Sequence, residues 1–269
     1  MPWFTRGRRR VTSRWPAHPD SYRDTFPGAV TPIDRPGEAV PAEIPAVCPT
    51  GAISRDGDRL HVDQGRCILC HRCVRQYPER FRFTIPAPAA HRDLLVVPAL
   101  PETDDALAAV RAELARRTRL LRRSIHVRHV DAGSDGADEW EVLALLNPVY
   151  DIHRLGIFFT ASPRHADVLL VTGVGSRGMA APLARTLQAA PRPLVVIAAG
   201  TDAISGGLVH PTYATSGGIG DLIAATPDSA GATGAADGDP VRVDIWVPGS
   251  PPTPFALLHA LLLAMGRLQ

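Results

Sequence analysis

The chain has 269 residues, 45% of them hydrophobic, so it is long enough to bury a sizeable core and to form two domains. Its formal net charge of +2 points to no strongly charged partner such as nucleic acid. The longest apolar runs, such as residues 255–265, are shorter than the stretch of about 18 residues that spans a bilayer, and no apolar segment follows the basic N-terminus. We therefore expect a cytoplasmic protein that meets a membrane only through partners.

The first part of the chain is predicted to be an extended arm followed by a small compact domain. Residues 1–45 are rich in proline and arginine and have few means of building a core. Residues 46–90 contain two short β-like runs, at 59–62 and 81–85, and a cysteine triplet between them that we expect to start a helix. These features predict a small α+β domain at 46–90.

The spacing of the cysteines in this small domain is typical of an iron–sulfur site. The four are Cys48, Cys67, Cys70 and Cys73. Cys48 stands alone before a proline, and the other three form a Cys-x2-Cys-x2-Cys triplet. Bacterial ferredoxins use such a triplet together with a Cys-Pro. In the two-cluster proteins, the cysteine of the Cys-Pro ligates the other cluster and not that of its own triplet. The sequence therefore predicts one 4Fe–4S cluster, held by all four thiols in a ferredoxin-like domain.

Other uses of the four thiols fit the pattern less well. A second cluster lacks ligands, because no triplet precedes Cys48 and Tyr77 occupies the place of its remaining cysteine. A structural zinc ion is the main alternative, but zinc ribbons usually bring two Cys-x2-Cys pairs. Disulfides are not expected, since the chain has no secretory signal and is too long to need them.

Residues 91–123 are predicted to be a linker and an amphipathic helix at 103–123. The apolar positions of this helix are Leu107, Val110, Leu114 and Leu121. Its arginines are Arg111, Arg116, Arg117, Arg119, Arg122 and Arg123. No nucleic-acid-binding motif accompanies them, so we interpret them as a solvated face or a docking surface rather than a lipid or nucleic-acid site.

Residues 124–269 are predicted to form a flavodoxin-like parallel α/β domain. We expect strands at 124–130, 168–172, 194–198 and 241–247, helices at 179–189 and from Pro254 onward, and a low-complexity loop at 225–240. Apolar runs rich in β-branched residues suit strands that are buried on both faces. The alternation of strands with helices predicts a parallel sheet that is covered on both sides.

Three segments of this domain carry a family resemblance: residues 147–156 (NPVYDIHRLG), 161–173 (ASPRHADVLLVTG) and 247–254 (VPGSPPTP). They resemble the cluster-bearing small subunit of membrane-bound NiFe hydrogenases, which also occurs in respiratory complex I. The N-terminal half resembles the ferredoxin-like subunit of the same complexes. We therefore interpret the chain as a fusion of two neighbouring subunits.

The chain departs from this family at the cluster ligands. The resemblance implies four cysteines, and the corresponding positions here are Asp135, Asp138, Asp202 and Ser250. Carboxylate and hydroxyl oxygens are poor ligands for iron–sulfur clusters, which need soft thiolates. We therefore expect the domain to keep its fold without a cluster. A hard cation such as Mg²⁺, Ca²⁺ or Mn²⁺ is the alternative occupant of the four oxygen side chains, and we favour an empty, hydrated site.

A glycine motif suggests a competing function. Gly173, Gly175 and Gly178 follow an apolar run and precede a predicted helix, which matches the dinucleotide-binding pattern Gly-x-Gly-x-x-Gly. Asp202 could then serve as the ribose-binding acid. Because the motif alone is weak and Asp202 is already explained as a replaced ligand, we interpret the loop as a structural turn.

The resemblance implies an electron-transfer subunit of a hydrogenase-like or complex I-like assembly. Its expected partners are a large catalytic-type subunit and membrane subunits, at the inner face of the cell membrane. The alternative is a structural or coupling subunit with a degenerate C-terminal domain, and an NAD(P)-binding enzyme ranks third.

Overall fold

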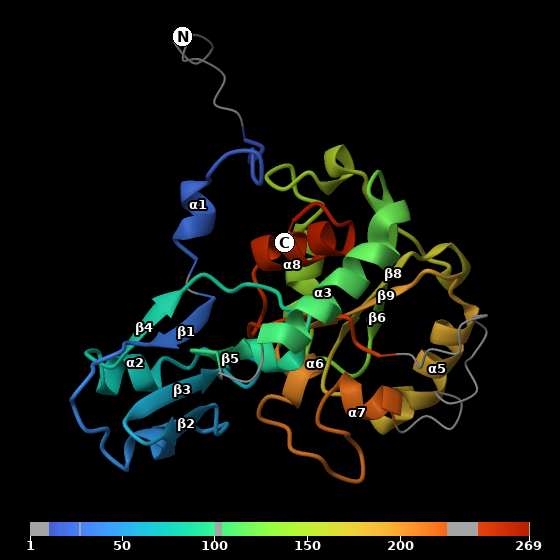
Figure 1. Cartoon of the computed structure of the whole chain (residues 1–269). Helices are drawn as coiled ribbons and strands as arrows, with labels where there is room; N and C mark the ends of the chain where they lie inside the picture. The colour runs from blue at the N-terminus through green and yellow to red at the C-terminus, as the bar shows by residue number, and fades with distance from the viewer. Residues whose placement is uncertain (1–10, 27, 100–103, 225–241, 269) are drawn as a thin grey trace, which may run out of the picture.

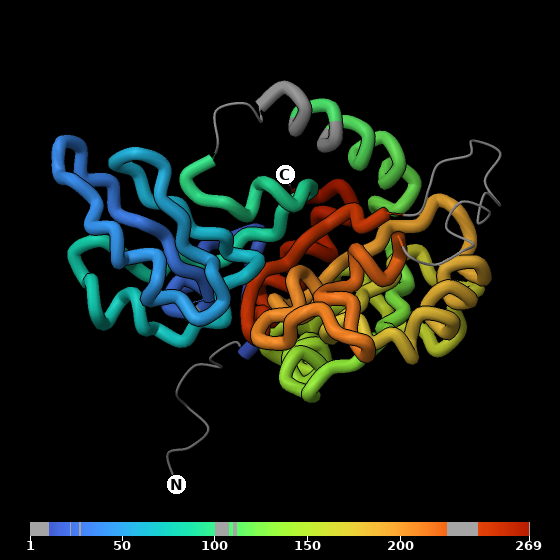
Figure 2. The backbone as a smooth tube through the Cα atoms, turned by 90° about the horizontal axis from the view of Figure 1, so that it is seen from below, coloured from blue at the N-terminus to red at the C-terminus, as the bar shows by residue number. Residues whose placement is uncertain are grey.

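The computed structural model describes residues 11–26, 28–99, 104–224 and 242–268 (Figure 1). A small unit of antiparallel strands lies beside a larger unit built on a parallel sheet, as Figure 2 also shows from below. Within the described ranges, no helix has both the length and the apolar character needed to cross a membrane.

The larger unit is organised by a five-stranded parallel sheet. Its strands are β6 (Ile125–Asp131), β7 (Ile157–Phe159), β8 (Val168–Thr172), β9 (Val195–Ala199) and β10 (Ile245–Val247). They lie in the order β10-β9-β8-β6-β7, and every neighbouring pair is parallel. Counted along the chain this is the 2-1-3-4-5 order of flavodoxin-like folds, so the predicted fold class is confirmed.

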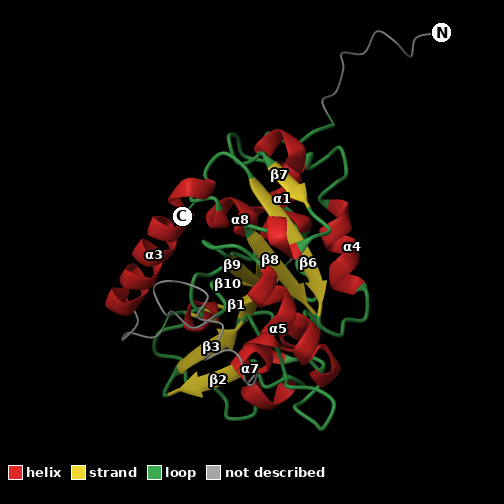
Figure 3. Cartoon of the chain, turned by 90° about the vertical axis from the view of Figure 1, so that its right-hand side faces the viewer, coloured by secondary structure: helices red, strands yellow, loops and turns green. Residues whose placement is uncertain are grey.

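Helices cover both faces of this sheet (Figure 3). One face packs against α4 (Ala137–Ala144) and α8 (Pro254–Ala264), and the other against α5 (Ala180–Ala189), α6 (Thr201–Ser205) and α7 (Ile219–Ala224). The predicted C-terminal helix begins where expected, because Thr253 accepts a hydrogen bond from the Ala256 N–H (3.2 Å) and Pro254 occupies the first turn. Every residue of β8 and β9 is buried between these layers, as their apolar sequences require.

The strands of the larger unit differ from the prediction in two places. The strand expected at 241–247 extends only from Ile245 to Val247, and the three-residue strand β7 was not expected. A run of three residues is too short to show a period, so β7 is recognised only by its pairing with β6. The loop expected at 225–240 lies outside the described residues.

The predicted amphipathic helix is α3 (Asp104–Thr118), followed by a short 3-10 turn at Arg119–Leu121. Leu114 and Leu121 are buried, as expected, while the side chains of Leu107, Val110 and Arg111 lie outside the described part of the chain. The interpretation of all the arginines as a solvated or docking face is wrong for Arg117. Its guanidinium donates to Asp244 Oδ1 (2.6 Å) and to the Leu194 carbonyl, and thereby ties α3 to the sheet.

The small unit has an α+β composition. Its strands β1 (Ala29–Pro32) and β4 (Phe81–Thr84) form one antiparallel pair, and β2 (Ile53–Asp56), β3 (Arg59–Asp63) and β5 (Val96–Val97) form a second sheet. The strands expected near 59–62 and 81–85 are thus present. The cysteine triplet does not start the helix: α2 spans Arg72–Gln76, so Cys67 and Cys70 precede it and Cys73 lies within it.

The segment expected to be an extended arm contributes to both units. Its residues 29–32 supply β1, and the short helix α1 (Ser21–Asp24) precedes that strand. Trp15 is buried against α8, where its ring meets the Phe255 ring edge-on at 6.0 Å between centroids. The arm therefore has no core of its own but adds residues to two cores.

Candidate functional site

The four cysteines of the small unit line one pocket. Cys48 follows the 3-10 turn Ile44–Val47, Cys67 and Cys70 lie in the loop between β3 and α2, and Cys73 lies in α2. All four thiols are free and half-buried. The remaining lining is mainly apolar: Val30, Val47, Ala52, Ile53, Val62 and Ile68. The fold thus brings together the four residues that the spacing singled out.

The loop that carries Cys67 and Cys70 has an unusual backbone. Leu69 and His71 have φ values of 53° and 65°, in the left-handed region that residues other than glycine seldom adopt. Such residues cost about 1–3 kcal/mol each and occur mostly at functional sites, where the surroundings hold them. The His71 ring packs edge-on against Phe83, with 4.6 Å between ring centroids, and so supports this conformation.

The thiols affect one another electrostatically. Burial raises the pKa of Cys67 to about 12, and the other three cysteines push it in the same direction. Burial, with Cys48 and Cys70, also raises the pKa of Cys73. Mutual repulsion of this kind requires the sulfurs to lie near one another, and it disfavours thiolates unless a positive group joins them.

Backbone donors point at three of the sulfurs. The Ala52 N–H donates to Cys48 Sγ (3.3 Å), and backbone hydrogen bonds from Leu69 and Val74 lower the pKa values of Cys67 and Cys73 against the effect of burial. Hydrogen bonds to cysteine sulfur are among the features by which proteins tune iron–sulfur groups.

The donor set therefore fits an iron–sulfur group, with four soft ligands on one pocket and N–H donors at three sulfurs. As the side chains stand, no three histidine, cysteine or carboxylate residues of the described ranges form a group that could hold a metal ion.

The larger unit gathers three of the four replaced positions. Asp138, near the start of α4, is only 5% exposed and packs directly on Gly200, because a Cβ at Gly200 would lie 2.4 Å from Asp138 Oδ2. Burial, together with the charges of Asp202, Glu139 and Asp135, raises the pKa of Asp138 to about 8. Burial, followed by Asp135 and Glu139, also raises the pKa of Asp202. At neutral pH this cluster therefore contains a protonated carboxyl group.

Ser250, the fourth replaced position, follows a residue whose backbone contacts α6, the helix that carries Asp202. The carbonyl of the preceding Gly249 accepts a hydrogen bond from the Thr201 N–H (2.7 Å) at the start of α6. No sequence pattern singles out Glu139, whose Oε2 is buried without a hydrogen-bond partner next to Asp138. A glutamate in the first turn of a helix is common and does not by itself indicate a site. The empty, hydrated site stays a prediction, with a hard cation at these oxygens as its alternative.

The glycine loop after β8 is occupied by protein contacts. The N–H groups of Val174, Ser176 and Arg177 donate to the carbonyls of Gly133, Ala132 and Ala214, at 3.1, 2.7 and 2.8 Å. A Cβ at Gly175 would lie 2.3 Å from Gly218 O, so the loop is pressed against a neighbouring backbone. A dinucleotide needs free loop amides and room for its pyrophosphate. These contacts favour the structural turn over a nucleotide site.

Comparison with known proteins places the larger unit in a family. Residues 136–264 match the family described as NADH ubiquinone oxidoreductase, 20 Kd subunit. The probable membrane-bound hydrogenase subunit mbhJ of Pyrococcus furiosus is 32% identical over 155 residues, which is 58% of this chain and 82% of that protein. This chain belongs to the 20 Kd subunit family. Asp138, Asp202 and Ser250 lie within the matched range, and the four cysteines lie outside it.

Two further proteins extend the comparison. Formate hydrogenlyase subunit 7 of Escherichia coli (strain K12) is 35% identical over 178 residues, which is 66% of this chain and 62% of that protein. The chain thus spans less than two thirds of the length of this relative. A chain from the membrane-bound sulfane sulfur reductase, an archaeal respiratory membrane complex, is 25% identical with a TM-score of 0.42, over 56% of this chain and 74% of that chain.

Proposed function

We propose that the chain is an electron-transfer subunit that carries one 4Fe–4S cluster on Cys48, Cys67, Cys70 and Cys73. The observation that carries this proposal is the shared pocket of four thiols, three of them with backbone N–H donors. Such a cluster, when bound, takes up and releases one electron at a time. The protein side supplies the apolar lining and the N–H groups, which set how easily the electron is accepted.

In this proposal the larger unit is a member of the 20 Kd subunit family that keeps the fold without a cluster. Asp135, Asp138 and Asp202 repel one another in a partly buried site, and Asp138 is held neutral by its surroundings. Carboxylic oxygens of this kind do not replace thiolates around iron and sulfide. The chain then combines a ferredoxin-like unit that has a cluster with a second unit that has lost one.

The partners and location follow from the relatives. One is named a subunit of formate hydrogenlyase and another a probable subunit of a membrane-bound hydrogenase. By analogy, the chain docks on a large catalytic-type subunit and on membrane subunits, at the inner face of the cell membrane. Membrane contact would come through these partners.

The second candidate is a structural or coupling subunit, and the aspartates favour it. Electrons that pass through a 20 Kd-type subunit need a cluster at the replaced site, and oxygen side chains stand there. If that site ends the electron path, the cysteine site serves stability or redox sensing. The two candidates differ in one property, because only a transfer subunit needs a group that is reduced reversibly at a physiological potential.

A potentiometric titration of the anaerobically purified chain, followed by electron paramagnetic resonance, separates the candidates. We expect a one-electron signal that appears on reduction and disappears on reoxidation without loss of iron. Cys73→Ala should abolish this signal. His71→Asn is the control and should retain it, because His71 lies between two of the ligands and asparagine tolerates its left-handed backbone. A site that holds zinc, or iron that cannot be reduced reversibly, would establish the structural candidate.

A further inference from the structure

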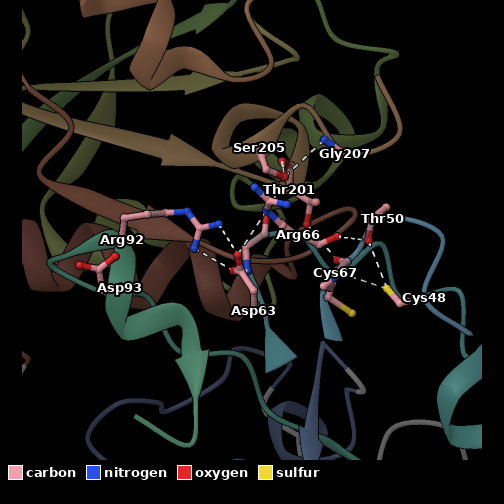
Figure 4. A network of polar contacts seen from close by, with 12 residues as sticks. Cys48, Thr50, Asp63, Arg66, Cys67, Arg92, Asp93, Thr201, Ser205 and Gly207 are labelled. Carbon is pink, nitrogen blue, oxygen red and sulfur yellow. Dashed lines mark hydrogen bonds and ion pairs between the residues drawn. The ribbon is translucent and has the colours of Figure 1, made fainter. Parts of the chain in front are cut away.

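Three successive carbonyls of the cysteine loop each accept a hydrogen bond from a hydroxyl side chain (Figure 4). The Gly65 carbonyl accepts from Ser205 Oγ (2.9 Å), the Arg66 carbonyl from Thr50 Oγ1 (2.7 Å) and the Cys67 carbonyl from Thr201 Oγ1 (3.0 Å). Two of these donors belong to the larger unit, although the loop belongs to the small one. The segment 65–67 is therefore held from both sides.

The two donors from the larger unit share one face of α6. Thr201 and Ser205 are four residues apart, which places their side chains one above the other on a helix. Thr201 is completely buried, so its bond to the Cys67 carbonyl is shielded from water. Ser205 shares its single hydroxyl hydrogen between Gly65 O and Thr201 O (3.2 Å). Thr201 is thus the firmer of the two contacts.

Close packing reinforces the contact. A Cβ at Gly65 would lie 2.8 Å from the Ile204 side chain of α6 and 2.9 Å from the Arg92 guanidinium, so any side chain at this position would crowd both. Asp63 fixes the start of the loop, because its carboxylate accepts the Gly65 N–H (2.9 Å) and two hydrogen bonds from Arg92 (2.8 and 2.6 Å).

The held segment leads directly to the sulfurs. The Cys67 carbonyl immediately precedes the turn in which the Leu69 N–H approaches the Cys67 sulfur. Thr50, which binds the Arg66 carbonyl, also touches Cys48 Sγ at 3.4 Å. Release of the Cys67 carbonyl would therefore change the direction of an N–H group that faces a sulfur, and such hydrogen bonds set the potential of iron–sulfur groups.

We propose that helix α6 of the larger unit is the positioning element of the cysteine loop in the small unit, with Thr201 as the positioning residue and Ser205 as its support. This inference rests on the proposed cluster for its effect on potential, but its structural part concerns the chain alone. The helix that carries a replaced cluster position, Asp202, thus serves the remaining thiol site of the other unit.

The test compares hydroxyl variants of the full-length chain. Thr201→Val removes the donor at nearly constant shape, Thr201→Ser keeps it, and Thr186→Val removes an equivalent hydroxyl-to-carbonyl bond on α5 (Thr186 Oγ1 to Pro182 O, 2.9 Å). Two quantities are measured: amide hydrogen exchange of residues 64–70 in the iron-free chain, and the midpoint potential of the iron-loaded chain.

We expect Thr201→Val to speed exchange in residues 64–70 about fivefold, the factor given by loss of one typical hydrogen bond, and to shift the midpoint potential. Thr201→Ser and Thr186→Val should match the wild type in both. If Thr201→Val does not fold, Ser205→Ala is read out in the same way with a smaller effect.

Unchanged exchange in Thr201→Val overturns the inference, whether or not iron is present. A wild-type chain that takes up no iron refutes the proposed function instead, and hydrogen exchange still decides the role of α6. Faster exchange with an unchanged potential also overturns the positioning role, because the contact would then affect the loop without affecting the sulfurs.

Discussion

The carboxyl group of Asp138 is buried, and only 5% of the residue is exposed to solvent. Its side chain packs on Gly200, and the nearby charges are those of other acids: Asp202, Glu139 and Asp135. A thiolate ligand at such a position would be neutralised by the cluster that it binds, whereas the Asp138 carboxyl is subject to burial and to the charges of neighbouring acids, which all disfavour its ionised form. Asp138 therefore keeps its proton in the folded chain at neutral pH.

The stability of the chain should therefore depend on pH through Asp138. Burial raises its pKa to about 8 in the folded chain, so the folded state keeps a proton that the unfolded state loses above about pH 4. The stabilisation is fully present below that pH and is lost as pH rises toward 8, by about 1.4 kcal/mol per pH unit at most. The side chain of Asp138→Asn does not titrate. The free energy of unfolding of this variant, measured in urea, should therefore rise relative to that of the wild type from pH 5 to pH 8.

Asp58→Asn is the control, because Asp58 is exposed in the turn between β2 and β3. Its unfolding curve should follow that of the wild type at each pH. If Asp138→Asn also ran parallel to the wild type over this range, Asp138 would be charged in the folded chain, and our description of the acidic cluster would be wrong.

At the level of elements, α3 is attached to the sheet by an ion pair whose carboxylate, that of Asp244, is buried. Asp244 lies just before β10, and its side chain is 4% exposed. It accepts hydrogen bonds from Arg117 Nη1 (2.6 Å) and from the Val196 N–H of β9 (2.8 Å). Removal of Asp244 is costly, because the Arg117 guanidinium loses its carboxylate partner and the Val196 N–H loses a buried acceptor.

Asp244→Ala should destabilise the chain by about 3 kcal/mol and speed hydrogen exchange in α3, measured by urea unfolding and by mass spectrometry. Asp93→Ala is the matched control, because Asp93 pairs with His91 on the surface and its loss should cost less than about 1 kcal/mol. A change below about 0.5 kcal/mol for Asp244→Ala would show that the pair does not hold α3 in place.

The elements with long apolar or periodic sequences could be predicted, and the short ones could not. β8 and β9 are continuous buried runs, and α8 opens with a Thr-Pro cap, so local sequence alone identifies them. β1 lies in a proline-rich segment and exists because β4 pairs with it. The start of α2 at Arg72 depends on the left-handed turns at Leu69 and His71, which the cysteine spacing does not reveal.

For the whole molecule, the chemistry of the candidate sites was readable from residue type and spacing, while their connection was not. A single Cys-Pro followed by a Cys-x2-Cys-x2-Cys triplet indicates soft-metal ligation from residue type and spacing alone. The approach of Asp138 to Asp202 follows from the family resemblance. Thr201 and Ser205 are ordinary hydroxyl residues, and only the packing of one unit on the other turns them into donors to the cysteine loop. Contacts between units depend on tertiary structure, which no local pattern encodes.

We propose that this chain holds one cluster, in the small unit, and none at the aspartates. Counting iron, acid-labile sulfide and zinc per chain on anaerobically purified protein tests this proposal most directly. We predict about four irons and four sulfides per chain, with no zinc. About eight irons would mean that the aspartate site also holds a cluster, and one zinc without iron would replace the electron-transfer role by a structural one.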